Sequence, residues 1–312
     1  MEDGEPIATT CRILSLDGGG AKGFYTLGVL NQLEALLGSR PLCEGFDVIF
    51  GTSTGAIIAS LLGLGKTVAE IHTIYKDHVP RLMSLNGAGA RSRTLEKLAH
   101  DVYGDLKFDA MKTDVGIVTA RWLEEKPMIF KTAVRQAHGR HSTFIPGFGA
   151  TIAEAVIASC SAYPIFNRKL VTIEDGGQVE LMDGGYCANN PTLYAVADGV
   201  KAFKMQPHQL RLVSVGVGNY PEPPKYWHKW LISKFFLVRL LHKTLAINTH
   251  SMEQLSALLF KDVPMVRVND SYTTPDMAAD LMEHDLTKLN ILYRRGAESF
   301  GKHENELRVL LA

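Results

Sequence analysis

A serine occupies the centre of the pentapeptide Gly51-Thr52-Ser53-Thr54-Gly55, which follows an apolar stretch and precedes a run of small and apolar residues. On a tight turn between a strand and a helix a serine adopts a strained backbone conformation, and glycines two positions away on each side avoid a collision. The first N–H groups of the following helix and the positive end of its dipole favour negative charge beside the serine oxygen. The pattern indicates that Ser53 is a nucleophile, although a glycine-flanked helix start would also fit these five residues.

Glycines are concentrated in a second segment, Asp17-Gly18-Gly19-Gly20-Ala21-Lys22-Gly23. Consecutive glycines expose backbone N–H groups with no Cβ in the way, and this geometry suits an anion. The anion would be a phosphate or the oxyanion of a tetrahedral acyl-transfer intermediate. A flexible turn would explain one glycine but not this many in so short a segment.

The same segment also matches G-x-G-x-x-G, the fingerprint of a dinucleotide site, through Gly18, Gly20 and Gly23. Such a site needs an acidic residue at the carboxyl end of the next strand to hold the ribose. The next predicted strand carries its acid, Asp47, at its start, and its carboxyl end leads to Ser53. We therefore favour the oxyanion interpretation and keep a nucleotide-binding regulatory module as the second hypothesis.

Asp183 is a candidate general base, because it leaves a predicted strand and is followed by Gly184 and Gly185. An aspartate held by glycines at a strand end can reach toward a second loop. The same triplet begins at Asp175, where strand segments flank it closely, as is typical of a hairpin turn. Asp183 is followed instead by a polar segment and a predicted helix, so it is the better candidate.

Together the three motifs resemble those of the patatin-like phospholipases. That family combines an Asp-Gly-Gly-Gly-x-Arg/Lys-Gly loop, a Gly-x-Ser-x-Gly turn and an Asp-Gly-Gly/Ala motif, matched here by residues 17–23, 51–55 and 183–185. The segments 188–191 and 214–218 are similar to the usual surroundings of these motifs in the family, and the resemblance covers most of the chain. Arginine is commoner at the position of Lys22, which keeps the charge but loses the planar donor fork.

The resemblance implies a patatin-like three-layer α/β/α fold with a mainly parallel central sheet, and hydrolysis of acyl esters in membrane phospholipids. It makes Ser53 the nucleophile and Asp183 its general base, a dyad without histidine. The oxyanion hole would be formed by backbone N–H groups, those of Gly18, Gly19 and Gly20 with Thr54. Further residues would support the motifs, namely Asp17, Lys22, Gly23, Gly51, Gly55, Gly184 and Gly185. A free aspartate has a pKa of about 3.9, so Asp183 must be buried or must act in concert with the attack.

A Ser-His-Asp triad is an alternative, because the chain has 11 histidines. In the chain order Ser, Asp, His, the candidates are His208, His250 and His284. An α/β-hydrolase usually places several strands before its nucleophile, whereas one strand clearly precedes Ser53. Most of the histidines also lie among charged or polar residues, as surface side chains do.

The elements around the motifs predict an α/β fold. Strands over 12–16 and 46–50 alternate with helices over 24–37 and 56–62, and this order implies a parallel sheet covered on both faces. Further strands are predicted over 114–120, 170–174, 179–182 and 210–217, and further helices over 152–158, 192–203, 251–260 and 286–300. Since no repeat, low-complexity tract or linker is found, we expect one domain over 1–312, with a core over about 12–215 and a helical C-terminal part over about 225–312.

Composition restricts the class of protein further. A hydrophobic content of 46% excludes a disordered chain, and 33 basic against 33 acidic residues give no overall attraction for a nucleic acid polymer. The four cysteines lack metal-ligand spacing, so neither a metal nor a cofactor is expected, and a reduced cytoplasmic compartment is favoured. The acidic N-terminus does not resemble a signal peptide, and no apolar run approaches the ~20 residues of a membrane span. We therefore expect a soluble cytoplasmic protein that associates peripherally with a membrane when it acts.

Residues 225–243 predict a basic amphipathic helix. Basic side chains gather on one side: Lys225, His228, Lys229, Arg239, His242 and Lys243. Apolar side chains fall opposite: Trp227, Trp230, Leu231, Phe235, Leu237, Val238 and Leu241. Three interpretations stay open, in which this helix faces a membrane, an anionic activator or the protein core.

Short patatins of this layout are similar to effectors of bacterial anti-phage signalling systems (CBASS), which a cyclic di- or oligonucleotide switches on to degrade the host membrane. The resemblance therefore implies a cyclic nucleotide activator beside the phospholipid substrate, and it is compatible with a homo-oligomer. The sequence does not identify the head-group preference or the residues that would bind an activator.

Overall fold

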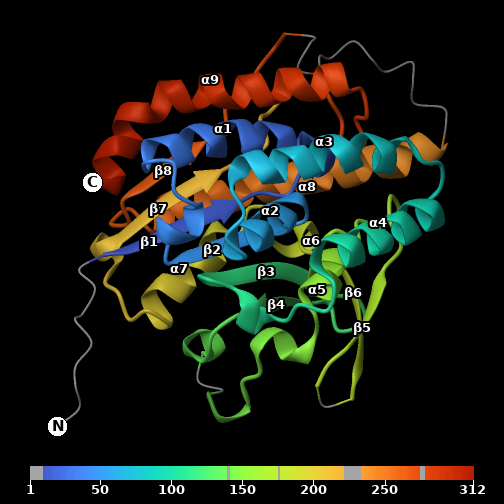
Figure 1. Ribbon diagram of the computed structural model, residues 1–312, viewed down its shortest axis with the longest axis horizontal. Helices are drawn as coiled ribbons and strands as arrows, with labels where there is room; N and C mark the ends of the chain where they lie inside the picture. Colours follow the sequence, from blue (N-terminus) through green and yellow to red (C-terminus); the bar gives the residue numbers. More distant parts are fainter. Residues whose placement is uncertain (1–9, 139–140, 175, 221–232, 275–277) are drawn as a thin grey trace.

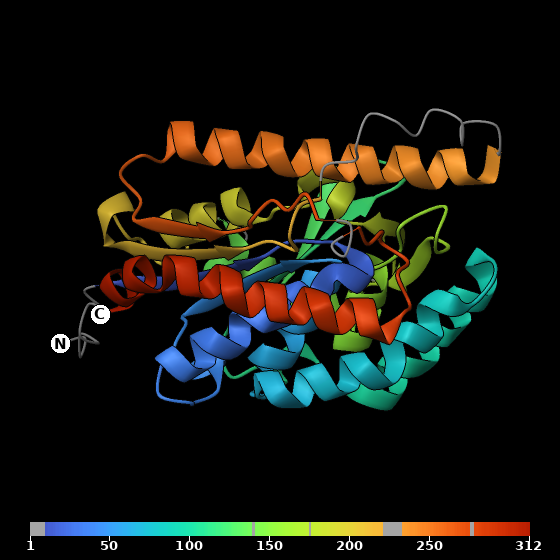
Figure 2. The ribbon, with the colours of Figure 1, turned by 90° about the horizontal axis from the view of Figure 1, so that it is seen from above.

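The computed structural model describes residues 10–138, 141–174, 176–220, 233–274 and 278–312. Within them an eight-stranded sheet forms the middle layer of the molecule, and helices cover both of its faces (Figure 1, Figure 2). The strand order is β5-β6-β3-β2-β1-β7-β8, and β4 pairs with β3. The predicted three-layer α/β/α fold with a mainly parallel central sheet is confirmed, and the sheet is mixed.

The strands and their bounds are β1 (Cys11–Leu16), β2 (Val48–Thr52), β3 (Asp114–Arg121), β4 (Lys126–Lys131), β5 (Lys169–Thr172), β6 (Gln178–Asp183), β7 (Leu210–Val215) and β8 (Met265–Val268). The pairs β1–β2, β2–β3, β1–β7 and β7–β8 are parallel. The strands β4, β5 and β6 join the sheet through antiparallel pairs. The β5–β6 pair is the predicted hairpin, whose turn residue Asp175 lies outside the described residues.

One face of the sheet is covered by α1 (Gly23–Leu36), α2 (Thr54–Gly63), α3 (Val68–Ser84) and α9 (Leu286–Leu311), and α5 (Ile152–Ser159) and α4 (Ala88–Tyr103) extend this layer toward β5. The other face carries α6 (Gly185–Ala188), α7 (Thr192–Lys201) and α8 (Ser233–Leu259). Figure 2 shows α8 and α9 on opposite sides of the sheet. Short 3₁₀ helices connect these elements: η1 (Gly20–Lys22), η2 (Leu42–Glu44), η3 (Phe108–Ala110), η4 (Val134–Ala137), η5 (His141–Thr143), η6 (Pro146–Gly149) and η7 (Pro207–Gln209).

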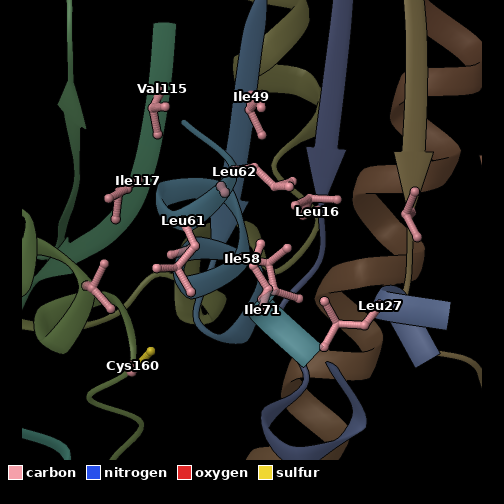
Figure 3. Close-up of a cluster of buried hydrophobic side chains, with 14 of the residues drawn as sticks. Leu16, Leu27, Ile49, Ile58, Leu61, Leu62, Ile71, Val115, Ile117 and Cys160 are labelled. Atoms are coloured by element: carbon pink, nitrogen blue, oxygen red, sulfur yellow. The ribbon is translucent and has the colours of Figure 1, made fainter. Parts of the chain in front are cut away.

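The central strands are buried on both faces, which explains their almost continuous apolar sequence. In the core shown in Figure 3, Leu16 and Ile49 of neighbouring strands lie beside the apolar side chains of α2. The core therefore fixes α2, and with it the turn that carries Ser53, against the middle of the sheet.

The helices α1 and α9 approach each other closely at two glycines. A Cβ on Gly28 would lie 1.9 Å from the backbone oxygen of Tyr293, and one on Gly296 would lie 2.0 Å from that of Tyr25. Neither distance is possible for a real side chain, so both positions require glycine.

The bounds of several elements differ from the sequence-based prediction. The strand β2 starts at Val48 rather than Phe46, because the N–H of Phe46 donates to the oxygen of Leu42 in the preceding turn. The helices α8 and α9 are longer than the predicted 251–260 and 286–300. The region expected to be helical also contains the strand β8, which extends the parallel part of the sheet.

Two helices that the prediction omitted, α3 and α4, lie beside α2 and α5. The start of α3 carries a recognisable capping box between Thr67 and Glu70. Pro80 lies inside α3, and it obscures the helical pattern because proline generally interrupts a helix. The first turn of α4 follows Gly87 and is rich in small and polar residues, so its apolar periodicity is weak.

The basic amphipathic segment is described only in part, because residues 225–232 lie outside the described residues. The remainder belongs to α8, as predicted. Leu241 is buried, whereas Leu237, which was assigned to the same face, is 50% exposed. Leu241 therefore packs on the core, and the predicted division of this helix into two faces is only partly correct.

Candidate active site

Ser53 links the end of β2 to the start of α2 and has a φ of 54° and a ψ of −120°. This conformation is unfavourable for residues other than glycine. A Cβ on Gly51 would lie 2.2 Å from the backbone oxygen of Gly55, and one on Gly55 would lie 2.3 Å from that of Leu16. The crowding expected of a nucleophile turn is therefore present on both sides of Ser53.

Side chains from distant elements hold this turn. The N–H of Ser53 donates to Ser159 Oγ at 2.9 Å, and Ser159 Oγ donates in turn to the oxygen of Val118 at 2.6 Å. Tyr75 Oη donates to the oxygen of Thr54 at 3.0 Å and lies 2.7 Å from Thr54 Oγ1. These contacts fix the strained backbone by hydrogen bonds from α5 and α3.

The strands β2 and β6 lie end to end along one edge of β3, because β4 pairs with the other edge alongside both of them. Thr52, the last residue of β2, pairs with Val118 of β3. Asp183, the last residue of β6, pairs with the next residue, Thr119. Since β2 is parallel and β6 antiparallel to β3, their carboxyl ends meet, and this brings Asp183 to Ser53.

The carboxyl group of Asp183 is buried, with 1% of the residue exposed. Its Oδ1 accepts a hydrogen bond from the N–H of Gly185 at 2.7 Å, whereas Oδ2 has no hydrogen bond of good geometry among the described residues. Burial raises the pKa of Asp183 to about 7, and the adjacent Ser53 hydroxyl and the Gly185 N–H oppose this rise. Asp183 is thus able to take up a proton near neutral pH.

The glycine-rich loop packs directly on the serine. A Cβ on Gly18 would lie 3.2 Å from Ser53 Cβ and 2.4 Å from Asn189 Oδ1. A Cβ on Gly23 would lie 2.5 Å from Thr54 Oγ1, and one on Gly184 would lie 2.2 Å from the oxygen of Val118. The glycine-rich loop and the serine turn therefore pack closely against each other, and Gly184 packs equally closely on β3.

One expected donor of the oxyanion hole needs correction. The N–H of Gly18 donates to the backbone oxygen of Asn189 at 2.9 Å, and Asn189 Nδ2 donates back to the oxygen of Gly18 at 3.1 Å. The N–H of Gly18 is therefore occupied. No described residue accepts a hydrogen bond from the N–H groups of Gly19, Gly20 or Thr54, so these three are available to a bound oxyanion.

Asp17 anchors the start of the loop through an ion pair that the sequence did not reveal. Both oxygens of its buried carboxylate bind Arg267 of β8, at 2.9 Å and 2.6 Å. Arg267 also donates to Ser214 Oγ at 2.8 Å. Because Arg267 is far from the motifs in sequence and lies on a strand that was not predicted, only the fold connects it with them.

An apolar pocket opens above Ser53 and Asp183. Gly19, Gly20 and Thr54 line it beside these two residues. The remainder of its wall is mostly apolar and comes chiefly from α3, α4, the segment after α5, and α8: Ile57, Val79, Leu82, Met83, Leu95, Cys160, Ala162, Ile165, Phe166, Leu245 and Leu281. Such a wall can accommodate an acyl chain next to the hydroxyl and the carboxyl group.

The alternative site residues lie elsewhere. His208, His250 and His284 are exposed, and none of them lines the pocket with Ser53. Asp47 accepts a hydrogen bond from the N–H of Arg12 near the start of β1, at the end of the sheet opposite to Ser53. A Ser-His-Asp triad would need a histidine beside Ser53, and a dinucleotide site would need an acidic residue at the carboxyl end of β2. None of these candidate residues lies at the required place.

Neither a metal site nor a membrane-spanning helix is found among the described residues. No group of three or more His, Cys, Asp or Glu side chains there could hold a metal ion. None of the helices that the structure describes has the length and apolar content of a membrane span.

Comparison with known proteins gives consistent similarities. The chain is 55% identical over 96% of its length, and 94% of the relative, to the cUMP-AMP-activated phospholipase of Escherichia coli. It is 27% identical to patatin-like protein 2 of Arabidopsis thaliana, over 93% of this chain and 83% of that one. The solved structure of VipD from Legionella pneumophila aligns with 94% of this chain and 66% of its own, with 12% identity and a TM-score of 0.48. The model of the patatin-like phospholipases matches residues 14–196. With this match and the 55% identical relative, the chain belongs to the patatin-like phospholipase family.

Proposed function

We propose that Ser53 and Asp183 form the catalytic dyad of this phospholipase, that it cleaves acyl esters of membrane phospholipids, and that cUMP-AMP switches it on. The observation that carries the catalytic part is the meeting of a strained serine and a buried carboxyl group at one end of an apolar pocket. The glycine-rich loop beside them supplies unoccupied N–H groups.

In the proposed reaction, Ser53 Oγ attacks the carbonyl carbon of the ester while its proton passes to Asp183 Oδ2, the oxygen without a hydrogen bond. The N–H groups of Gly19, Gly20 and Thr54 bind the developing oxyanion. The intermediate then collapses to an acyl-serine, and the departing alcohol takes the proton from Asp183. A water molecule, deprotonated by Asp183, attacks the acyl-serine. Asp183 then returns this proton to Ser53 Oγ as the bond to the acyl group breaks and the fatty acid leaves.

A pKa near 7 for Asp183 suits this role. An ordinary aspartate is too weak a base to accept a serine proton effectively, whereas a base with a pKa near the working pH combines the correct charge state with adequate strength. The same burial excludes water from the carboxyl group, which strengthens its interaction with the reacting hydroxyl.

The lipid substrate is supported by the pocket wall. Val79, Leu82 and Met83 of α3 line it together with Ile165 and Phe166, and these side chains offer contact to an aliphatic chain rather than to a polar acyl group. In this proposal the protein is cytoplasmic and associates peripherally with the membrane while it hydrolyses phospholipid.

Activation by cUMP-AMP is supported by the relative that carries this activity in its name, because the identity of 55% extends over nearly the whole of both chains. From the resemblance of the sequence to effectors of bacterial anti-phage signalling systems, we propose that the protein acts as an anti-phage effector. A regulatory module that only binds nucleotide is the second candidate, and the glycine-rich loop is the feature that favours it.

Phospholipid vesicles incubated with the full chain, with and without cUMP-AMP, test these proposals. We expect fatty acid release that depends on cUMP-AMP, labelling of the enzyme by a fluorophosphonate probe, and loss of both in Ser53→Ala. Ser60→Ala is the matched control, because Ser60 is buried in the same helix α2 but bonds only to Ile57 and Tyr103. Nucleotide binding without labelling or hydrolysis would support the regulatory module instead. Hydrolysis that is independent of cUMP-AMP would contradict activation by this nucleotide but would leave the catalytic dyad and the lipid substrate in place.

A further inference from the structure

A second pocket lies on the other side of the glycine-rich loop. Gly18, Gly19 and Gly218 form part of its backbone wall. In contrast to the apolar pocket, it is lined by polar side chains that come from separate elements: Lys22, Asn219, Thr249, His250 and Asn269.

The ammonium group of Lys22 is the charge that this pocket leaves without a partner. Lys22 is half-buried, and among the described residues its ammonium group forms no hydrogen bond and no ion pair within 4.0 Å. Asp17 also lines the pocket, but its carboxylate is bound by Arg267 through both oxygens. Asp280 is close enough to favour the charge of Lys22 but is itself exposed. The ammonium group of Lys22 is therefore free of a direct ionic contact among the described residues and can bind an anion in the pocket.

The other polar groups of the pocket can bind the oxygens of an anion. His250, on α8, is exposed and has no hydrogen bond among the described residues. Within the described part of the chain, the side chain of Asn219 makes only a long contact, in which Nδ2 lies 3.4 Å from Ser271 Oγ. Two further side chains are used internally, since Thr249 accepts from Asn189 and Asn269 accepts from the N–H of Gly218. Lys22, His250 and Asn219 thus remain as donors.

We propose that this pocket binds a phosphodiester group, with Lys22 as its main charged contact and with His250 and Asn219 as further donors. The inference deepens the proposed function, on which it rests, by giving the activator a binding site. Both a cyclic dinucleotide and a phospholipid head group carry a phosphodiester, and the experiment below separates these two sources.

The position of the pocket explains how a ligand bound there would affect the catalytic residues. Gly19, Leu245 and Leu281 line both pockets, so the loop is the wall between them. The oxygen of Leu281 accepts a hydrogen bond from the N–H of Ala21 at 3.0 Å and thereby holds the loop from the C-terminal region. A phosphodiester bound to Lys22 contacts this loop directly and biases the positions of the Gly19 and Gly20 N–H groups beside Ser53.

Calorimetric titration of the full chain in the Ser53→Ala background tests the proposal, with cUMP-AMP and glycerophosphocholine as the two probes. We expect Lys22→Met to weaken binding of one probe at least ~10-fold, as loss of a charge-assisted hydrogen bond does, and Lys22→Arg to restore most of it. Lys201→Met is the control, because Lys201 is exposed at the end of α7. His250→Glu changes an exposed residue and places a negative charge at the pocket, so it should weaken the same probe even if Lys22→Met fails to fold.

The two probes separate the sources. Weakening of cUMP-AMP binding assigns the pocket to the activator, and weakening of glycerophosphocholine binding alone assigns it to the head group. Wild-type affinity of both probes in folded Lys22→Met and His250→Glu would overturn the phosphodiester site. If the parent protein binds no cUMP-AMP, activation by that nucleotide fails as a function, whereas the glycerophosphocholine arm and inorganic phosphate still test the pocket.

Discussion

Ser53 and Asp183 stand at the meeting ends of two strands that share one edge of β3. The pairs Thr52–Val118 and Asp183–Thr119 occupy consecutive positions of β3. The two side chains are separated by 130 positions in sequence, yet their separation in space is set by adjacent rungs of one sheet. Pairing with the backbone of β3 thus places Ser53 next to Asp183.

Replacement of Asp183 by asparagine should abolish hydrolysis, because the amide cannot accept the serine proton while it retains the acceptor oxygen for the Gly185 N–H. In the parent enzyme, kcat/KM should rise with pH and level off above about pH 7, as Asp183 loses its proton. Initial rates on vesicles between pH 5 and 9 measure this profile. Asp175→Asn is the control and should keep full activity. A profile that is flat through pH 7 would contradict the assignment.

The raised pKa of Asp183 also predicts a pH-dependent stability. Below about pH 4 the carboxyl group is protonated in both the folded and the unfolded state, so it does not change the free energy of unfolding with pH. Between about pH 4 and pH 7 the unfolded chain loses this proton while the folded protein retains it, so the free energy of unfolding falls as the pH rises. The loss is on the order of 4 kcal/mol above pH 7. Urea unfolding should therefore give Asp183→Asn a larger free energy of unfolding than the parent at pH 8, and the difference between the two should shrink at pH 4.5.

Ser53→Gly should be more stable than Ser53→Ala. The φ of 54° and ψ of −120° at this position are accessible to glycine, whereas alanine retains the strain of serine. We expect a difference of about 1 kcal/mol in the free energy of unfolding, measured by urea titration, with both variants inactive. Equal stability of the two variants would show that the turn relaxes when the hydroxyl is removed.

Arg267→Met should destabilise the protein by roughly 3–5 kcal/mol, because the carboxylate of Asp17 would stay buried without its partner. Arg308→Met is a suitable comparison, because Arg308 pairs with Glu304 one helical turn away and both side chains are exposed. Loss of this pair should lower the free energy of unfolding by less than about 0.5 kcal/mol. Thermal and urea unfolding measure both changes. Similar effects of the two substitutions would disprove the anchoring role of Arg267.

Gly296→Ala should destabilise α9 by more than about 2 kcal/mol, because the added methyl group collides with the backbone of α1. Gly301→Ala, five residues later in the same helix, has no atom within 4 Å of its new Cβ. That variant should gain about 0.5–1 kcal/mol from the better helix propensity of alanine. Opposite signs of the two effects in urea unfolding are the expected result, and equal signs would contradict the packing described for α1 and α9.

The sequence by itself determined the local features whose causes lie within a few residues. The turn around Ser53 could be predicted, since Gly51 is required by a contact with the backbone of Gly55 within the same pentapeptide. The buried strands β1, β3 and β7 and the β5–β6 hairpin could be predicted as well, because apolar runs and turn residues are local signals. Asp183 could be chosen over Asp175 from the different segments that follow them.

The tertiary structure alone decided which groups surround these residues. The N–H of Gly18 is occupied by Asn189, and Asp17 is bound by Arg267, over sequence separations of 171 and 250 residues. The wall of the apolar pocket comes partly from α3 and α4, which local patterns did not reveal. Hydrogen bonds and burial of this kind depend on which strands pair and which helices pack, and short sequence patterns carry little information on either.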